Sequence, residues 1–493
     1  MKLKIKKLKF MTGRSISVIH EKTAEELGFH IGDRISIENK NKKIISVIDI
    51  ISKMIKLNEI AVSEKIIRFL RIKDGDNVEI KIIEKPYCID LIKKKLDGHR
   101  LNKNEIKEII ENIANNSLTE IEIAFFISAV HSGGMSLNET KYLTEAMVET
   151  GNILKLKGKI ADKHSIGGIA GNKTTPILVS ICAATGLIIP KTSSRAITSA
   201  AGTADVVETI TRVDFSIKEI KKIIKKTNAC FVWGGALGLA PVDDEIIRIE
   251  RLINIDSTSQ LLASILSKKI SVGSKYILID IPYGKSAKVT KKQAEKLKGL
   301  FLDLADKFKI NLEVALTDGS EPIGNGIGPV LEMNDVIKVL SRKNPPKDLE
   351  EKSIFLSGKL LELSRKVKSG EGEKLAMEIL NSKKALKKFN QIVQAQSGNK
   401  NKIKKFKKPK FSYEINAEKN IKVDHISNNL INRLARYLGC PEDKSAGIYL
   451  HKKKGGEAKK GEKIMTIYAD SKEKLKHGIN FYKKEMGNII EFS

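Results

Sequence analysis

The first 84 residues of the chain carry hydrophobic patterns that are typical of short β-strands. Residues 16–19, 34–37 and 78–82 are rich in β-branched side chains or alternate apolar with polar positions, and this period of two favours strands. A Gly-Asp turn precedes two of these segments, at Gly32 and at Gly75, in similar sequence settings. We therefore expect residues 1–84 to contain a duplicated β unit, and we predict a small β-barrel. No catalytic grouping lies here, so we interpret this domain as one for packing or oligomerisation.

The pattern changes to a helical period close to residue 85. Apolar residues recur every three or four positions through residues 89–113, 118–130 and 137–150, which places them on one face of each helix. We predict a helical domain over residues 85–155, completed by part of residues 205–255.

Further along, short apolar runs alternate with helical patterns. Residues 230–232, 276–281 and 312–316 are apolar runs of strand length, as expected of parallel strands that are buried on both faces. Helical patterns such as residues 243–253 lie between them, and strands alternating with helices indicate an α/β domain. We assign this domain to residues 156–400, and we expect ligands to bind beyond the carboxyl ends of its strands.

Two shorter segments complete the domain plan. The basic run within residues 401–420 predicts a linker, and residues 421–493 carry the mixed patterns of a small α/β domain. The predicted fold class is therefore α/β, with a helical domain, a larger α/β domain, an N-terminal β-barrel and a small C-terminal α/β domain.

Residues 162–203 hold the strongest candidate for a binding site. They read D-K-H-S-I-G-G-I-A-G-N-K-T-T-P, then a helix-length apolar segment at 177–189, then K-T-S-S-R-A-I-T-S-A-A-G-T. Glycines let backbone amides approach an anion, and lysine and hydroxyl groups add donors. The two loops are thus predicted to form a phosphate cradle. The spacing of a P-loop is absent, and the alternative is a pair of ordinary Gly/Ser turns.

Composition adds one rival hypothesis. The chain of 493 residues has a formal net charge of +30, which raises nucleic-acid binding as an alternative. However, the lysines are spread along the chain, aromatic residues make up only 5%, and no DNA- or RNA-binding module is recognisable. A lysine-rich solvated surface is therefore the interpretation we prefer.

Cysteine usage and hydropathy predict the setting of the protein. The four cysteines lie far apart without a C-x-x-C pair, so we expect neither a metal site nor a disulfide framework. No apolar run reaches the roughly 18 residues that a membrane span needs, and the amino terminus lacks the apolar core of a signal peptide. We expect a cytoplasmic protein without a membrane partner.

The quoted motifs resemble those of a known enzyme family. Residues 162–168 are similar to the signature of the thymidine/pyrimidine-nucleoside phosphorylases, and the continuation to Pro176 resembles their archaeal AMP-cleaving branch. The resemblance extends through residues 263–269 and 317–319 and covers most of the chain from residue 85 onward. It implies a homodimer or larger homo-oligomer, with inorganic phosphate as co-substrate and no further cofactor.

The resemblance also implies roles for individual residues. Lys163, Ser165, Ser193 and Thr203 would hold the attacking phosphate. The expected substrate-binding set is Gly168, Ser194, Arg195, Ala196, Ile197, Thr198, Ser199, Thr203, Ser264 and Lys288. The expected phosphate-binding and secondary set is Lys163, His164, Ser165, Ser193 and Lys268.

Two positions differ from the pyrimidine-specific enzymes, which read the base with an arginine, a serine and a lysine. Ser264 and Lys268 match two of these, but Ile249 stands at the position of the arginine. Lys288 adds a cation where the pyrimidine enzymes carry an apolar residue. An extra cation suits a substrate with an additional phosphate, a nucleoside 5′-monophosphate.

The departing base needs a proton, and the resemblance implies that Asp256 is the donor. A purine leaves as the neutral base when it is protonated at N7, and a buried carboxyl group can hold a proton near neutral pH. The alternative is that Asp256 only caps the helix that follows it. His164 could assist at the sugar or the base, or serve only as a structural partner of its loop.

These observations favour one function over three alternatives. The predicted enzyme is a pentosyltransferase that converts AMP and phosphate into adenine and ribose 1,5-bisphosphate in AMP catabolism, with CMP and UMP as further candidate substrates. The alternatives are a thymidine/pyrimidine-nucleoside phosphorylase, a phosphoribosyltransferase and a basic nucleic-acid-binding protein.

Overall fold

The computed structural model describes the chain except for residues 8–14, 41, 197–198, 254, 256 and 398–408. The chain divides into two compact units. The first unit comprises Met1–Gly151 and Ala240–Ser267, and the second comprises Asn152–Leu239 and Lys268–Ser493.

The N-terminal part of the first unit is a closed β-barrel with the strand order β1-β5-β2-β4-β3-β6. Its strands are β1 (Lys2–Lys6), β2 (Ile16–His20), β3 (Arg34–Asn39), β4 (Lys42–Ile51), β5 (Glu59–Val62) and β6 (Asn77–Ile82). Helices α1 (Glu21–Leu27) and α2 (Glu64–Leu70) each lead through a turn into a strand, β3 or β6. The barrel is confirmed, and the repeated helix–turn–strand order agrees with the predicted duplication.

The rest of the first unit is helical. Its helices are α3 (Cys88–Leu96), α4 (Lys103–Ala114), α5 (Glu120–Gly133), α6 (Leu137–Glu149) and α10 (Pro241–Ile253). The predicted apolar faces share one core, in which Ile106, Ile109 and Ile113 of α4 are buried beside Ile246 of α10. The segment that returns to this unit is 240–267, whereas residues 205–239 belong to the second unit.

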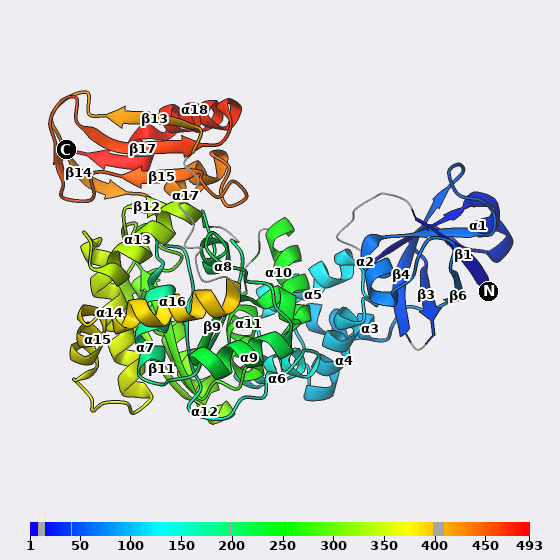
Figure 1. Cartoon of the computed structure of the whole chain (residues 1–493). Helices are drawn as coiled ribbons and strands as arrows, with labels where there is room; N and C mark the ends of the chain where they lie inside the picture. The colour runs from blue at the N-terminus through cyan, green and yellow to red at the C-terminus, as the bar shows by residue number, and fades with distance from the viewer. Residues whose placement is uncertain (8–14, 41, 197–198, 254, 256, 398–408) are drawn as a thin grey trace. The chain divides into compact units, whose positions relative to one another are not determined.

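The second unit contains a parallel sheet (Figure 1). Its strands are β7 (Ala161–Ser165), β8 (Ile189–Ser193), β9 (Ala229–Trp233), β10 (Tyr276–Tyr283) and β11 (Asn311–Asp318). Strands β11, β10 and β7 pair in that order, β8 pairs with β9, and a bridge between Ile160 and Ile188 joins the two sets. The α/β fold that the alternating pattern predicted is therefore confirmed.

Helices pack around this sheet. They are α7 (Thr174–Ala184), α8 (Thr203–Val207), α9 (Ile217–Thr227), α11 (Thr258–Ser271, which crosses the boundary of the units), α12 (Lys291–Phe308), α13 (Pro329–Ser341), α14 (Lys347–Leu363), α15 (Gly372–Asn381) and α16 (Lys384–Ser397). Helix α7 is buried along almost its whole length, as expected of a helix that is apolar on all sides. It ends at Ala184, because the chain turns at Gly186 with a φ of 83° before β8 begins.

The C-terminal part of the second unit holds two small sheets. One has the order β12-β15-β17-β13 and the other β16-β14-β18. The elements are β12 (Gly326–Ile327), β13 (Phe411–Asn416), β14 (Ile421–Ile426), α17 (Asn428–Tyr437), β15 (Gly447–Leu450), β16 (Glu457–Ala458), β17 (Lys463–Ala469), α18 (Lys472–Ile489) and β18 (Ile490–Phe492).

Two strands of these sheets come from unexpected places. Strand β13 lies inside residues 401–420, which were predicted to be a linker, and it pairs with β17 along its length. That part of the segment therefore belongs to the C-terminal domain, while residues 401–408 lie outside the described residues. Strand β12 follows β11 and pairs with β15, so the α/β domain contributes a strand to the C-terminal sheet.

No helix in the described part of the chain is long and apolar enough to cross a membrane.

Candidate active site

The carboxyl ends of the parallel strands bring the predicted loops to one edge of the sheet. Strand β10 pairs in parallel with β7, with Asp280 opposite Ser165. Strand β8 lies on the other side of β7, through the bridge between Ile160 and Ile188. The loops that follow β7, β8 and β10 therefore begin at the same edge, which is where ligands bind in open α/β sheets.

Gly168 and Lys288 approach each other closely at this edge. Gly168 has a φ of 92°, and a Cβ atom there would lie 3.0 Å from the Cβ and 3.1 Å from the backbone nitrogen of Lys288. Only glycine therefore fits without displacing the loop that carries Lys288. The side chain of Lys288 is exposed, so the structure brings two predicted substrate-binding positions together.

Lys163 is a buried lysine at the end of β7. Its Nζ donates a hydrogen bond to Oγ1 of Thr174, at 3.1 Å, where α7 begins. The same Nζ lies 3.5 Å from Oδ2 of Asp280. Burial, then the charges of Lys352 and Lys173, lower the pKa of Lys163 to about 8, although Asp280 opposes them. An amine that is charged at neutral pH and sits beside a helix N-terminus suits an anion.

Asp162 organises a second pair of buried lysines. Lys269 donates to its Oδ2 at 2.5 Å. Lys191 donates to its Oδ1 at 3.3 Å and to the backbone oxygen of Lys163 at 2.7 Å. Burial alone would raise the pKa of Asp162, but Lys191 and Lys269 lower it below its ordinary value, so the carboxylate stays charged.

The roles of Lys191 and Lys269 were missed in the sequence analysis. Both are almost completely buried, with 4% and 1% of their surface exposed. Lysines within apolar segments are the signal that could have identified them, because buried lysines are rare unless they are paired.

His164 lies among these lysines. Its pKa is lowered well below the ordinary value, first by burial and then by the charges of Lys269, Lys191, Lys268 and Lys163. The imidazole is therefore neutral at pH 7. The surplus of cations creates a positive potential at the carboxyl end of β7, which attracts an anion such as phosphate.

The loop that follows β8 is held by carboxylates. Arg195 forms two hydrogen bonds of 2.7 Å with Glu208 and one of 3.2 Å with Asp205. Its guanidinium group also lies over the ring of Trp233, 5.0 Å from the centroid. The backbone N–H of Ala196 donates to Asp205 at 2.7 Å. Arg195 and Ala196, at the start of this loop, are therefore held against Asp205 and Glu208.

The other predicted residues of this loop lie as follows. The hydroxyl of Ser193 donates to the backbone oxygen of Val232 at 3.5 Å, and that of Ser199 donates to the backbone oxygen of Ala201 at 3.0 Å. Ser194 is exposed. Thr203 begins α8. Ile197 and Thr198 lie outside the described residues.

The predicted base-reading residues lie on or near α11. Ser264 and Lys268 are four residues apart on this helix and both are partly buried, so they share one face. Asp256 lies outside the described residues. Ile249 is 2% exposed within the helical core of the first unit. The neighbouring Arg248 binds Glu120 and Glu245.

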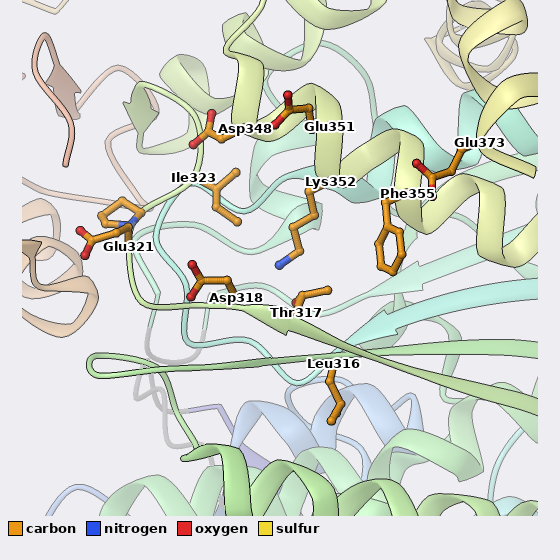
Figure 2. A pocket seen from close by; sticks show the side chains of 11 residues that line it. Leu316, Thr317, Asp318, Glu321, Ile323, Asp348, Glu351, Lys352, Phe355 and Glu373 are labelled. Atoms are coloured by element: carbon orange, nitrogen blue, oxygen red, sulfur yellow. The ribbon is translucent and has the colours of Figure 1, made fainter. Parts of the chain in front are cut away.

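A cavity of about 570 Å³ opens beside β11 (Figure 2). Its lining includes Thr317 and Asp318 at the carboxyl end of β11, and the amine of Lys352 points towards them. None of the predicted site residues lines this cavity. Lys352 is nevertheless connected to the site, because its Nζ lies 3.6 Å from Oδ1 of Asp280, the partner of Lys163.

Asp280 remains ionised between these lysines. Burial would raise its pKa, but Lys163, Lys352 and the hydroxyls of Thr317 and Ser165 lower it below the ordinary value.

Within the described parts of the chain, no three His, Cys, Asp or Glu residues are grouped so that they could hold a metal ion.

Three domain families match the chain. The helical bundle domain of a glycosyl transferase family matches residues 89–151, and an a/b domain of a glycosyl transferase family matches residues 157–386. The C-terminal domain of pyrimidine nucleoside phosphorylases matches residues 422–487. A solved anthranilate phosphoribosyltransferase from Thermus thermophilus has a TM-score of 0.53 at 16% identity, covering 62% of this chain and 99% of that chain. That likeness shows a shared fold alone.

Curated relatives match over nearly the full length. An AMP phosphorylase of Methanocaldococcus jannaschii is 44% identical over 449 residues, which are 91% of this chain and 89% of the relative. An AMP phosphorylase of Thermococcus sibiricus is 42% identical over 483 residues, which are 97% of this chain and 96% of the relative. The chain therefore belongs to the thymidine/pyrimidine-nucleoside phosphorylase family, within its AMP phosphorylase branch.

Proposed function

We propose that this protein is a nucleoside-5′-monophosphate phosphorylase that converts AMP and inorganic phosphate into adenine and ribose 1,5-bisphosphate. The observation that carries the proposal is the group of lysines around His164, at the sheet edge where the glycine-rich loops begin. The AMP phosphorylase names of the relatives support the choice of AMP as substrate.

The reaction needs one bond to form and one to break. A phosphate oxygen bonds to C1′ while the C1′–N9 bond breaks and its electron pair leaves with the base. Lys163 and the hydroxyl groups at this edge would hold the phosphate beneath C1′, where positive charge develops in the transition state. Adenine takes up a proton at N7, and Asp256 is the residue we propose to supply it.

Lys288 is the residue that we propose to select nucleotides over nucleosides. Lys288 is exposed and lies beside Gly168, in the loop after β7. Its amine could bind the 5′-phosphate of the nucleotide from there. Pyrimidine-specific enzymes carry a base-reading arginine at the position of Ile249. In this chain Ile249 is buried in the helical core, so this position gives no support for a pyrimidine substrate. CMP and UMP remain further candidate substrates. We propose that the enzyme acts in the cytoplasm as a homodimer or larger homo-oligomer.

The first experiment measures phosphate-dependent release of base from AMP, adenosine, thymidine and uridine. We expect release from AMP in preference to the three nucleosides, and loss of that release in Lys163→Met. Preference for thymidine or uridine would establish the pyrimidine enzyme instead. No release from any of them, together with nucleic-acid affinity that falls steeply with salt, would establish the binding protein.

A further inference from the structure

Two asparagines on α17 of the C-terminal domain contact the loops of the candidate site. Asn428 and Asn432 are four residues apart on this helix, so they share one face. They are 0% and 4% exposed. Asn428 is the first residue of α17, and Asn432 lies in its interior, where asparagine is a poor residue. A buried amide is costly at either position unless its hydrogen bonds are made. Their presence therefore needs an explanation in the contacts that they form.

Asn428 connects three loops of the α/β domain. Its Oδ1 accepts a hydrogen bond of 2.9 Å from the backbone N–H of Ala170, in the loop after β7. Its Nδ2 donates at 3.0 Å to the hydroxyl oxygen of Ser286, in the loop after β10. The same Nδ2 donates at 3.0 Å to the backbone oxygen of Gly319, in the loop after β11. A side chain with both an acceptor and two donors can make all three bonds.

Asn432 contacts the loop that follows β8. Its Oδ1 accepts a hydrogen bond of 2.9 Å from the backbone N–H of Ala200, in the loop after β8. Ala170 and Ala200 are themselves buried in the same hydrophobic cluster as Ile431 of α17. Both glycine-rich loops therefore pack on one helix face and each receives one amide oxygen from it.

We propose that Asn428 and Asn432 are positioning residues that hold the two phosphate loops in register, so that the C-terminal domain forms part of the catalytic machinery. The proposal rests on the proposed function in one respect, that the loops bind inorganic phosphate. A loop displaced by even a small distance would weaken every donor it presents to the phosphate.

Other contacts hold the C-terminal domain in place when one asparagine is changed. Strand β12 pairs with β15. Glu321 accepts a hydrogen bond of 2.8 Å from the backbone N–H of Ile426, and Lys285 pairs with Glu491 at 2.7 Å. Single substitutions on α17 are therefore expected to change the loops and leave the domain docked.

The test compares substitutions that keep or remove individual hydrogen bonds of the two asparagines. In Asn432→Asp an acceptor for the N–H of Ala200 remains, although a buried carboxylate carries its own cost, so we expect KM for phosphate to rise less than in Asn432→Ala. In Asn428→Asp the donors to Ser286 and Gly319 are lost, and we expect KM for phosphate to rise about tenfold or more. Asn432→Ala, which removes the acceptor, is expected to raise it about tenfold.

Two controls separate positioning from general stability. Asn429→Ala changes an exposed asparagine on the same helix and should leave KM for phosphate unchanged. Ile467→Val loosens the buried core of the C-terminal domain and should lower Tm with little change in that KM. Folded Asn432→Ala and Asn428→Asp enzymes with wild-type KM values, or an equal rise in Ile467→Val, would overturn the proposal.

Binding of inorganic phosphate, measured by titration calorimetry on the full chain, keeps the two proposals distinct. A wild-type protein that binds phosphate but does not cleave AMP would refute the proposed function. The same titrations would then test the positioning role, since we expect weaker binding in Asn428→Asp and Asn432→Ala and unchanged binding in Asn429→Ala. Equal phosphate affinity in all four proteins would refute the positioning role whatever the substrate is.

Discussion

The amine of Lys163 lies 3.5 Å from the carboxylate of Asp280, and both side chains are almost completely buried. Asp280 also lies 3.6 Å from Lys352, so one buried carboxylate stands between two lysines. Because two cations share one anion, these three groups together carry a net positive charge at the sheet edge where the two glycine-rich loops begin. If phosphate binds here as we propose, its affinity should depend on the protonation of Lys163.

Phosphate affinity is predicted to fall above pH 8. The pKa of Lys163 is about 8, and the neutral amine cannot attract phosphate. We expect KM for phosphate to rise about tenfold for each pH unit beyond this value. Initial rates between pH 7.5 and 10 measure it, with Lys163→Met as the variant that should bind phosphate weakly at every pH.

The free energy of unfolding should rise with pH over the same range in which phosphate affinity falls. In the unfolded chain Lys163 returns to its ordinary pKa of 10.5, so between about pH 8 and 10.5 the unfolded state binds more protons. The contribution of Lys163 to the free energy of unfolding therefore rises with pH across this window. Loss of activity that coincides with a loss of structure by circular dichroism would contradict the assignment.

Lys352→Met is predicted to move this pH limit upward. The charge of Lys352 helps to lower the pKa of Lys163, so its removal should leave Lys163 protonated to a higher pH. The rise in KM for phosphate should then begin at a higher pH than in wild type. Lys359→Met is the matched control, because Lys359 lies two turns further along α14 and pairs with Glu313 at 3.6 Å. An unchanged profile in Lys352→Met would mean that the two lysines are not coupled.

Lys288→Ala is predicted to weaken the binding of nucleotides selectively. Loss of a cation that contacts the 5′-phosphate should raise KM for AMP about tenfold, with a smaller effect on kcat. Cleavage of adenosine, which lacks that phosphate, should not change. Lys285→Ala serves as the control, since Lys285 is an exposed lysine of the same loop that pairs with Glu491 at 2.7 Å. Equal effects of the two substitutions on KM would remove Lys288 from the substrate site.

Local patterns were sufficient for the parts of the fold that depend on neighbouring residues. The barrel followed from period-two alternation and repeated Gly-Asp turns. The first site loop was recognisable because glycine at position 168 is required by a φ of 92° and a close neighbour. Strand β13 was missed because five of its six residues remain partly or fully exposed and it is defined by its pairing with β17.

The electrostatics of the site depend on residues that are far apart in the chain. Lys269 binds Asp162 across 107 positions, and Asn428 binds Ala170 across 258 positions. No short motif contains both members of either pair. Such contacts are set by the order of strands in the sheet and by the docking of the C-terminal domain, which a local pattern does not specify.

Ile249→Arg is predicted to destabilise the protein without creating a pyrimidine-nucleoside phosphorylase. Ile249 is 2% exposed in the helical core of the first unit, and an unpaired buried guanidinium group should cost roughly 3 kcal/mol or more. Urea unfolding measures this cost. Leu252→Arg adds the same side chain to the same helix at a position that is 67% exposed, and it should change stability little. A stable Ile249→Arg variant that cleaves thymidine would contradict the burial argument.

Glu208→Gln is predicted to loosen the loop after β8 and to make the fold less sensitive to acid. Glu208 accepts hydrogen bonds of 2.7 Å from both terminal nitrogens of Arg195, and Arg195 is the main cause that lowers its pKa to about 2. The ordinary value is 4.5, so between pH 4.5 and 2 the unfolded state binds the proton first. The stability that the charged form provides is complete above this window and is lost as the pH falls through it.

Two measurements check this last prediction. Unfolding by urea at pH 7 and at successive pH values down to 3 should show that the wild type loses more free energy of unfolding than Glu208→Gln does. At pH 7 the variant should also have a kcat/KM for AMP that is lower by about threefold to tenfold, because Arg195 no longer fixes the loop. If this loss acts through Arg195, Glu208→Gln will have little further effect in an Arg195→Met background. Fully additive losses in the double variant would show that Glu208 acts through another partner, of which Lys444, at 2.9 Å, is the candidate that the structure provides.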